Sequence, residues 1–157
     1  MWLPMGDFIS DGTYFIKSDN YTTILSPGNT RLPITVTAYN DLDESLYLYA
    51  GRGYTRLGRV KPTIAAPGVN VVGPDLKKGF QAFSGTSVAA AHTAGVVAMM
   101  LEWGVVNKKI PKMTTVEITK LMIRGARRKP DMEYPNREWG YGILDLYSLY
   151  DAIRFVL

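Results

Sequence analysis

The sequence GTSVAAAHTAG at residues 85–95 places a serine, Ser87, on a glycine-containing turn directly before a run of small apolar residues. Such a run predicts a helix, because alanine is the strongest helix former, and we expect this helix to occupy residues 87–103. Alanine, glycine, valine and methionine stand on nearly every side of it. This pattern is typical of a helix that is packed around its whole circumference at the centre of a layered α/β domain.

The position of Ser87 at the start of a helix gives its hydroxyl a possible chemical role. A helix N-terminus presents unpaired backbone N–H groups and the positive end of the helix dipole, which both stabilise the oxyanion that develops during acyl transfer. The backbone N–H of Ser87 is one such donor, and Gly85 permits the turn before it by lacking a side chain or by adopting a positive φ. From these residues alone the simpler interpretation is an N-cap serine.

His92 is the only histidine of the chain, and it lies five residues after Ser87. Residues five apart in a helix are separated by about 140° around the axis and about 7.5 Å along it. A general base must come within roughly 2.6 to 3.2 Å of the group that it deprotonates. His92 therefore cannot activate Ser87 within one helix, and we expect a hydrogen-bonded core histidine.

The rest of the chain predicts short strands and two further helices, separated by glycine, proline and charged turns. Residues 34–39 and 46–50 are expected to form an antiparallel or edge pair. The helix at residues 115–125 is expected to begin with a capping box of Thr114 and Glu117 and to end at Gly125. The remaining predicted strands are residues 64–66, 69–72 and 79–83, and the last predicted helix is residues 146–156.

Composition and charge restrict the classes of function. The chain has 157 residues, of which 46% are hydrophobic, a net charge of +4 and no cysteine, so disulfides and cysteine-based metal sites are excluded. Basic residues gather at 52–61 and 124–129. We interpret the first group as a solvated loop beside a sheet, although Tyr54 among glycines gives it some likeness to an RNA-binding segment, and the second as the charged end of a helix. Nucleic acid is rejected as the main partner.

Neither a metal site nor a membrane segment is expected. Asp41, Asp43 and Glu44 lie close together, but their spacing does not match a calcium-binding loop of the EF-hand type, and a charged turn is the simpler interpretation. The longest apolar stretch, residues 88–101, is too short for a bilayer. We therefore predict no metal, no cofactor and no membrane contact.

Several segments resemble, in order and spacing, the C-terminal part of the catalytic domain of subtilisin-like serine proteases (subtilases). The serine motif at 85–95 resembles their nucleophile motif, although Ala91 stands where many members have proline. The segments at 26–28 and 32–39 resemble a family strand, and those at 49–55 and 58–68 resemble the stretch that precedes the serine. The resemblance covers residues 21–157 and implies a partial subtilisin-like fold: short strands of a mainly parallel sheet packed by a central buried helix and two further helices.

The resemblance implies specific roles for three residues. Ser87 would be the nucleophile of a serine endopeptidase, Thr86 would lie beside the oxyanion, and Gly85 would support the turn. The family's catalytic Asp and His and its oxyanion asparagine lie upstream of every matched segment, as do most of its specificity pockets. The chain alone is therefore expected to be inactive, because a serine hydroxyl without a base is a poor nucleophile.

The resemblance also bears on organisation, partners and location. Residues 1–20 are expected to be a tail or hairpin, or else a remnant of an inserted β domain like that of clostridial, spore-associated subtilases. This likeness implies a secreted or spore-associated bacterial protein. The expected partners are a peptide or protein substrate, the missing N-terminal part of the catalytic domain, and further copies of the chain. The alternative hypothesis is a non-catalytic, subtilase-like scaffold that binds or activates a partner.

Overall fold

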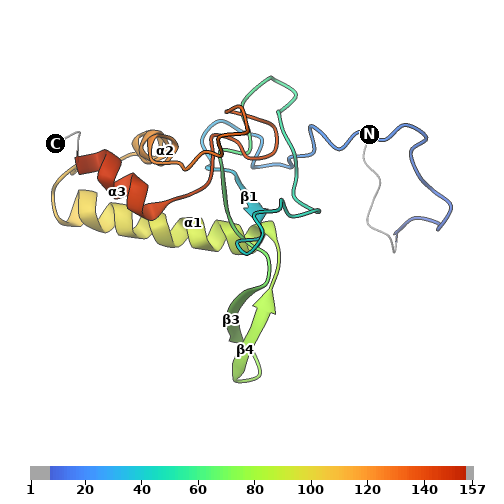
Figure 1. Ribbon diagram of the computed structural model, residues 1–157, viewed down its shortest axis with the longest axis horizontal. Coiled ribbons are helices and arrows are strands. Elements are labelled where there is room, and N and C mark those ends of the chain that lie inside the picture. The colour runs from blue at the N-terminus through green and yellow to red at the C-terminus, as the bar shows by residue number, and fades with distance from the viewer. Residues whose placement is uncertain (1–7, 155–157) are drawn as a thin grey trace.

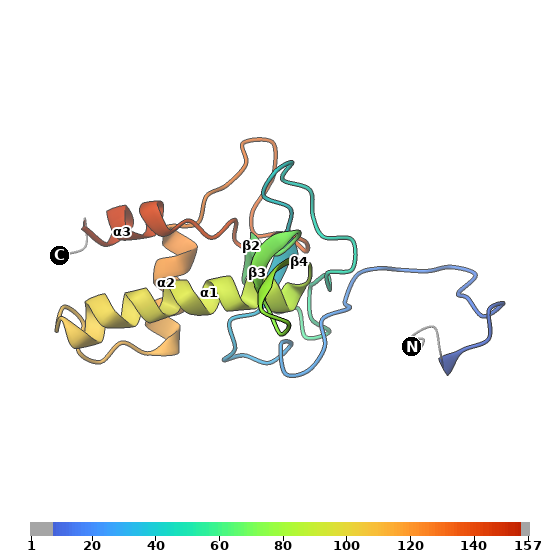
Figure 2. The same ribbon diagram turned by 90° about the horizontal axis from the view of Figure 1, so that it is seen from below.

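The computed structural model describes residues 8–154 and has the predicted α/β fold, with short strands beside three α-helices (Figures 1 and 2). Every predicted helix is present, and all predicted strands except residues 46–50 have a counterpart. In chain order the elements are β1 (Val36–Tyr39), β2 (Ile64–Pro67), β3 (Val71–Asp75), β4 (Gly79–Phe83), α1 (Thr86–Leu101), the π-helical turn η2 (Glu102–Val106), α2 (Thr115–Arg124) and α3 (Leu146–Arg154).

The parallel part of the fold is centred on β2. Strand β1 pairs with β2 in parallel, with Val36 opposite Ile64 and Tyr39 opposite Pro67. On the other side of β2, Ala65 forms a parallel bridge to Ile143. Because β2 has neighbours along both edges and on its faces, the side chains of Ile64, Ala65 and Ala66 are completely buried, as is typical of parallel strands.

Strands β3 and β4 form a separate antiparallel hairpin that projects from the body next to the start of α1 (Figure 1). Every residue of β4 is exposed. The predicted strand at residues 69–72 begins later than expected, at Val71, because Asn70 adopts a left-handed conformation with φ of 54°. The hairpin leads the chain out of β2 and back to the serine turn.

Helix α1 runs against the β1–β2 pair, but only along one side. Its buried residues are Ala89, Thr93 and Met100, and most of its remaining small residues are exposed. The prediction of a helix packed around its whole circumference is therefore wrong for residues 8–154. The composition of α1 is that of a buried helix, but the described part of the chain covers only one of its sides.

The helical run formed by α1 and η2 is longer than the sequence suggested. Thr86–Val106 comprises 21 residues with a mean hydropathy of 1.4, so its length and composition would suffice to cross a membrane. Core helices of soluble proteins meet the same criterion, and α1 packs Ala89 against Ala38 and Ala66 of the sheet. The helical run is thus long enough for a bilayer, and the expectation that this apolar stretch is too short is wrong. The absence of membrane contact stays a prediction.

Helices α2 and α3 cover the far end of α1 (Figure 2). Thr114 accepts a hydrogen bond from the Glu117 backbone N–H at 3.4 Å, and the Glu117 carboxylate accepts one from the Thr114 N–H, which confirms the predicted capping box. Helix α2 ends at Gly125 as expected, with the Gly125 N–H donating to Leu121. The core here consists of Ile64, Met100, Ile118, Met122, Ala126, Leu149 and Ile153.

Two sequence predictions of strands or hairpins fail in the loops. Residues 46–50 form no strand and contribute one antiparallel bridge, between Leu46 and Tyr39. Residues 8–20 contain no hairpin and extend away from the helices as an arm (Figure 1). The predictions for residues 1–7 lie outside the described part of the chain.

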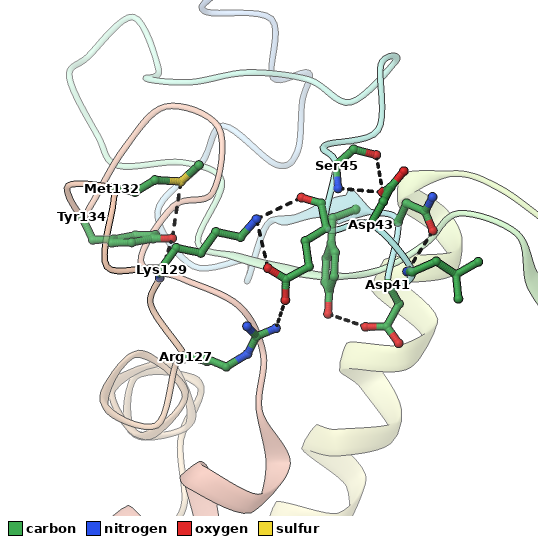
Figure 3. A network of polar contacts seen from close by, with 11 residues as sticks. Asp41, Asp43, Ser45, Arg127, Lys129, Met132 and Tyr134 are labelled. Carbon is green, nitrogen blue, oxygen red and sulfur yellow. Dashed lines mark hydrogen bonds and ion pairs between the residues drawn. The ribbon is translucent and has the colours of Figure 1, made fainter.

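The acidic turn after β1 is bonded to the segment that follows α2 (Figure 3). Glu44 forms ion pairs with Arg127 at 2.8 Å and with Lys129 at 3.2 Å, and these contacts hold the pKa of its carboxyl below the ordinary value. Burial and a hydrogen bond to Asp41 raise the pKa of the Tyr39 phenol to about 12. The carboxylates therefore serve as a charged turn, and no group of three or more possible metal ligands occurs between residues 8 and 154.

The basic group at 124–129 is divided between two roles. Arg128 donates to the Ile123 carbonyl in the last turn of α2, as expected for a cation at a helix C-terminus. Arg127 and Lys129 instead pair with Glu44, and Lys129 also lies 4.5 Å from the centre of the Trp139 ring. The interpretation as the end of a helix thus applies to only part of this group.

Candidate functional site

Ser87 lies in the first turn of α1 and its side chain is exposed. The helix begins at Thr86, so the N-cap residue is Gly85, and no side chain caps this helix end. The interpretation of Ser87 as an N-cap serine is therefore wrong. Among the described residues, the Ser87 hydroxyl has no hydrogen-bond partner, which leaves it free to act on a molecule from solvent.

The turn before Ser87 requires a glycine for conformational reasons. Gly85 adopts φ of 156° and ψ of 161°, a region that is essentially restricted to glycine. A Cβ atom at Gly85 would meet no atom closer than 3.9 Å, so lack of space is not the cause. Of the two reasons considered from the sequence, a positive φ and a crowded turn, the structure supports the first.

The turn is fastened to the carboxyl end of the parallel strands. The Gly85 N–H donates to the Gly68 carbonyl at 2.7 Å, and the Gly68 N–H donates to the Tyr39 carbonyl at 3.0 Å. Gly68 permits this approach, since a Cβ there would lie 2.7 Å from the Ala38 Cβ and 2.8 Å from the Gly85 oxygen. The serine turn is thereby held against the ends of both β1 and β2.

A second pair of hydrogen bonds holds the other side of the turn. The hydroxyl of Ser84 accepts a hydrogen bond from the Asn70 N–H at 2.9 Å and donates to the Asn70 side chain at 3.4 Å. This contact joins the residue before β3 to the residue after β4, at the base of the hairpin and directly before the helix. Neither Ser84 nor Asn70 is predicted from the sequence. A serine ahead of the glycine turn is a weak signal, because serines are common in loops.

The helix N-terminus supplies unpaired hydrogen-bond donors beside the Ser87 hydroxyl. Gly85 O accepts from the N–H groups of Val88 and Ala89 at 3.1 and 3.3 Å, but the N–H of Ser87 has no acceptor among residues 8–154. Such an N–H, together with the positive end of the helix dipole, attracts a developing oxyanion. The geometry therefore offers a hydroxyl and an oxyanion donor on one exposed turn.

His92 is held away from Ser87 by the sheet. Its Nδ1 lies 2.9 Å from the carbonyl oxygen of Pro67, at the end of β2. The predicted hydrogen bond is thus present, but the imidazole is exposed and not part of a core. The prediction of burial fails for the same reason as for α1 as a whole, since no described residue covers that side of the helix.

A pocket of about 430 Å³ adjoins the serine turn at Thr86, which is half-buried. Loops without any predicted site residue form most of its wall. The family resemblance had suggested that specificity pockets would come from upstream segments, so this pocket was not expected. Its lining residues are Asn20, Thr23, Ile24, Leu25, Gly28, Thr35, Val36, Leu48, Tyr49, Ala50, Gly51, Arg52, Pro62 and Thr86.

Comparison with known proteins gives one consistent family. A model described as "Subtilase family" matches residues 10–142. The chain is 32% identical over 139 residues to the membrane-bound transcription factor site-1 protease of Mus musculus, covering 85% of the chain and 13% of that protein. It is 34% identical over 134 residues to the serine protease AprX of Bacillus subtilis, covering 73% of the chain and 29% of that protein.

Among solved structures, the fold is similar to that of the CspB protease of Clostridium perfringens. The TM-score is 0.85 at 33% sequence identity, and the match covers 90% of this chain and 31% of that one. The chain thus spans less than a third of the length of each of these relatives.

Proposed function

Because this chain belongs to the subtilase family, we propose that Ser87 is the nucleophile of a serine endopeptidase. The observation that carries the proposal is the exposed Ser87 hydroxyl at the N-terminus of α1, beside an N–H group that has no acceptor in the described chain. Family membership supports the serine protease class. The assignment of Ser87, Thr86 and Gly85 to roles in this site is the proposal.

In the proposed reaction, the Ser87 oxygen attacks the carbonyl carbon of a peptide bond and its proton passes to a base. The carbonyl oxygen becomes an oxyanion, which the Ser87 N–H stabilises at the positive end of α1, with the Thr86 hydroxyl beside it. Collapse of this intermediate expels the amine, which takes up the proton, and leaves an acyl-enzyme at Ser87. Water then releases the acyl group.

The proposed base comes from polypeptide outside residues 8–154. His92 is the only histidine of the sequence, and its Nδ1 faces the Pro67 carbonyl. We propose that a catalytic Asp and His lie in an N-terminal part of the catalytic domain, that residues 21–157 are its C-terminal part, and that residues 1–20 are a tail from an inserted β domain. The 157-residue chain alone is then inactive, since loss of triad members costs on the order of a millionfold in turnover.

The pocket beside Thr86 supports a peptide substrate. It adjoins Thr86, the residue directly before Ser87, and its wall contains apolar residues, among them Ile24, Val36 and Leu48. A side chain of the substrate would fill it, and its contacts would orient the scissile bond, which is a large part of enzymatic rate enhancement.

Hydrolysis of a peptide substrate by the full-length protein tests this function. Wild type should cleave the substrate, Ser87→Ala should be inactive, and the 157-residue chain should be inactive too. A matched control is Ser148→Ala, which removes a hydroxyl from α3, away from the serine turn, and leaves Ser87 in place, so most of the activity should remain. If Ser87→Ala cleaves as fast as wild type, the proposed nucleophile is wrong.

A non-catalytic scaffold is the competing function, and the same observation on His92 favours it. If the upstream positions lack the Asp and the His, the full-length protein would bind or activate a partner without cleaving it. Wild type and Ser87→Ala would then be equally inactive. Sequencing of the upstream region and the hydrolysis assay together distinguish the two hypotheses.

We also propose where the protein acts and that the isolated chain associates with itself. One bacterial relative, 29% identical over 134 residues, is the minor extracellular protease Vpr of Bacillus subtilis. This likeness supports secretion of the present protein, and association with the spore is our more specific proposal. The exposed apolar side of α1, together with the edges of the short strands, supports self-association of the isolated chain.

A further inference from the structure

A second pocket, of about 470 Å³, lies between two loops away from Ser87. Three of its six lining residues are arginines, and none is acidic. We refer to it as the arginine pocket, and its lining residues are Asn29, Thr30, Arg31, Arg56, Leu57 and Arg59. Neither the family comparison nor the proposed chemistry at Ser87 uses these side chains.

The three guanidinium groups of the arginine pocket are not neutralised within the described chain. The ion pairs found between residues 8 and 154 involve Arg52, Arg127 and Lys129, and none involves Arg31, Arg56 or Arg59. Like charges that share a pocket repel one another, so their placement together carries a free-energy cost. A bound anion would offset this cost.

The two loops that carry the arginines are held by their own hydrogen bonds. The Thr30 N–H and hydroxyl both donate to the Pro27 carbonyl, at 3.0 and 2.7 Å. In the other loop the Thr55 N–H donates to the Arg59 carbonyl at 3.1 Å, and the Arg59 N–H donates to the Thr55 hydroxyl at 3.0 Å. Because the backbone is fixed on both sides, less entropy is lost when an anion binds.

The side-chain amide of Asn29 is a further hydrogen-bond donor at the arginine pocket. The Oδ1 atom of Asn29 lies 3.3 Å from the Ser26 hydroxyl, from which it accepts a hydrogen bond. Its Nδ2 group has no acceptor among the described residues, and Asn29 is one of the residues that line the pocket. The pocket therefore combines charged donors and a neutral donor, which is the combination that carboxylate oxygens accept.

The structure separates these arginines from the other members of the basic group at residues 52–61. Arg52 pairs with Glu138 at 3.0 Å, and Lys61 is buried and bonded to the carbonyl of Pro33. Only Arg56 and Arg59 remain free, and they join Arg31 from another loop. The interpretation of the whole group as a solvated loop is therefore too simple.

The chemistry of the arginine pocket favours a peptide over a nucleic acid. No aromatic residue lines it, so bases would find no stacking surface. Tyr54, the aromatic residue in this sequence segment, instead lies against Arg137 and donates to the Pro135 carbonyl at 2.9 Å. The volume falls in the range of organic ligands, about 300–1,000 Å³, which is larger than one inorganic ion needs.

We propose that the arginine pocket binds an acidic polypeptide segment, with guanidinium groups of Arg31, Arg56 and Arg59 bonded to its carboxylates. Arginine forms bidentate hydrogen bonds with carboxylates, and Leu57 gives the pocket an apolar wall for the rest of the segment. Binding here needs no cleavage, so the proposal stands or falls independently of the nucleophilic role of Ser87.

Fluorescence anisotropy with a labelled hexaglutamate peptide and the 157-residue chain tests this proposal. Hexaglutamate should bind at low salt and hexaglutamine should not. The double variant Arg56→Gln/Arg59→Gln should weaken binding at least about tenfold, because charge-assisted hydrogen bonds are lost. Arg31→Gln, on the other loop, should also weaken it, which guards against an effect of local unfolding at residues 55–59.

The matched control is Arg124→Gln, which removes an exposed arginine at the end of α2. It should change the affinity by less than about twofold, since a single distant charge acts only through screened electrostatics. Equal binding by the double variant and wild type would overturn the proposal. So would tighter binding of a single-stranded RNA hexamer through the same arginines, or release of the peptide by inorganic phosphate but not by sodium chloride of equal ionic strength.

Discussion

At the scale of single residues, two glycines in and near α1 differ sharply in what surrounds them. Gly68 lies where the end of β2, the serine turn and α1 meet, and a Cβ there would come within 3.0 Å of three atoms. Gly95 lies on the exposed side of α1, and a Cβ there would meet no atom within 4 Å. The same substitution should therefore have opposite effects at the two positions.

We predict that Gly68→Ala lowers the free energy of unfolding by about 1–3 kcal/mol, because the added methyl group overpacks the contact with Ala38. Gly95→Ala should raise it by about 0.5–1 kcal/mol, since alanine favours the helix over glycine. Denaturant titration of both variants checks the two signs. A Gly68→Ala variant as stable as wild type would contradict the close approach at the serine turn.

Glu44 provides a prediction on pH. Hydrogen bonds and ion pairs with Arg127 and then Lys129 lower the pKa of the carboxyl below its ordinary value of 4.5. The folded state therefore favours the ionised form. The stabilisation is fully present above pH 4.5 and is lost as the pH falls through the lowered pKa.

Glu44→Gln should accordingly reduce the loss of stability on acidification below pH 4.5, while it lowers stability near neutrality by removing both ion pairs. Thermal unfolding at a series of pH values measures this. Glu133→Gln is the control, because Glu133 forms no ion pair in the described chain. Parallel pH profiles for Glu44→Gln and wild type would show that the Glu44 pairs do not stabilise the fold.

Also at the residue scale, the sequence predicted the environment of Ser87 better than that of His92. The need for glycine at position 85 follows from local chain geometry, which a short motif contains. The exposure of His92 depends on which polypeptide covers α1, and no local pattern contains that information. The pocket beside Thr86 was missed because its lining residues are scattered from Asn20 to Thr86 and meet only in the folded chain.

At the scale of elements, α2 was predicted almost to the residue because its end signals are local. Thr114 and Glu117 form the capping box, and the helix ends before Gly125. The strand predicted at 46–50 failed for the opposite reason, since a strand exists only where a partner runs alongside, and Leu46 meets just Tyr39. Strand formation thus depends on contacts that apolar alternation alone does not specify.

The capping box of α2 gives the element-scale prediction. Thr114→Ala removes the acceptor of the Glu117 N–H and should cost about 1 kcal/mol of stability. Thr115→Ala, at the next position, is the control, since the Thr115 side chain forms no hydrogen bond in the described chain and the change should be nearly neutral. Thermal unfolding followed by circular dichroism compares the stability of the two variants. An equal loss of stability in both would show that the capping box does not stabilise the fold.

At the scale of the whole molecule, the main departure from expectation is the uncovered side of α1. Its composition predicts burial on all sides, yet Ala90, Ala91, Ala94 and Ala98 are exposed in the structure. A helix with such a composition is stable when another apolar surface covers it. We propose that the N-terminal part of the catalytic domain supplies that surface in the full-length protein, and that a second copy supplies it in the isolated chain.

We predict that the isolated chain sediments as a dimer or a larger oligomer, and that Ala94→Lys, which places a charge on the exposed side of α1, shifts it toward the monomer. Val116→Lys, which alters an exposed apolar residue on α2, should leave the oligomeric state unchanged. Sedimentation velocity measures both. A stable, well-folded monomer of the unmodified chain would contradict the proposal.

The central claim is that Ser87 is a nucleophile whose proton acceptor belongs to polypeptide outside this chain. Covalent labelling with a serine-directed fluorophosphonate tests it most directly, on the full-length protein, its Ser87→Ala variant and the 157-residue chain. We predict labelling of the full-length protein only, because the hydroxyl needs both its helix N-terminus and an external base. Labelling of the Ser87→Ala variant, or equally rapid labelling of the isolated chain, would contradict the claim.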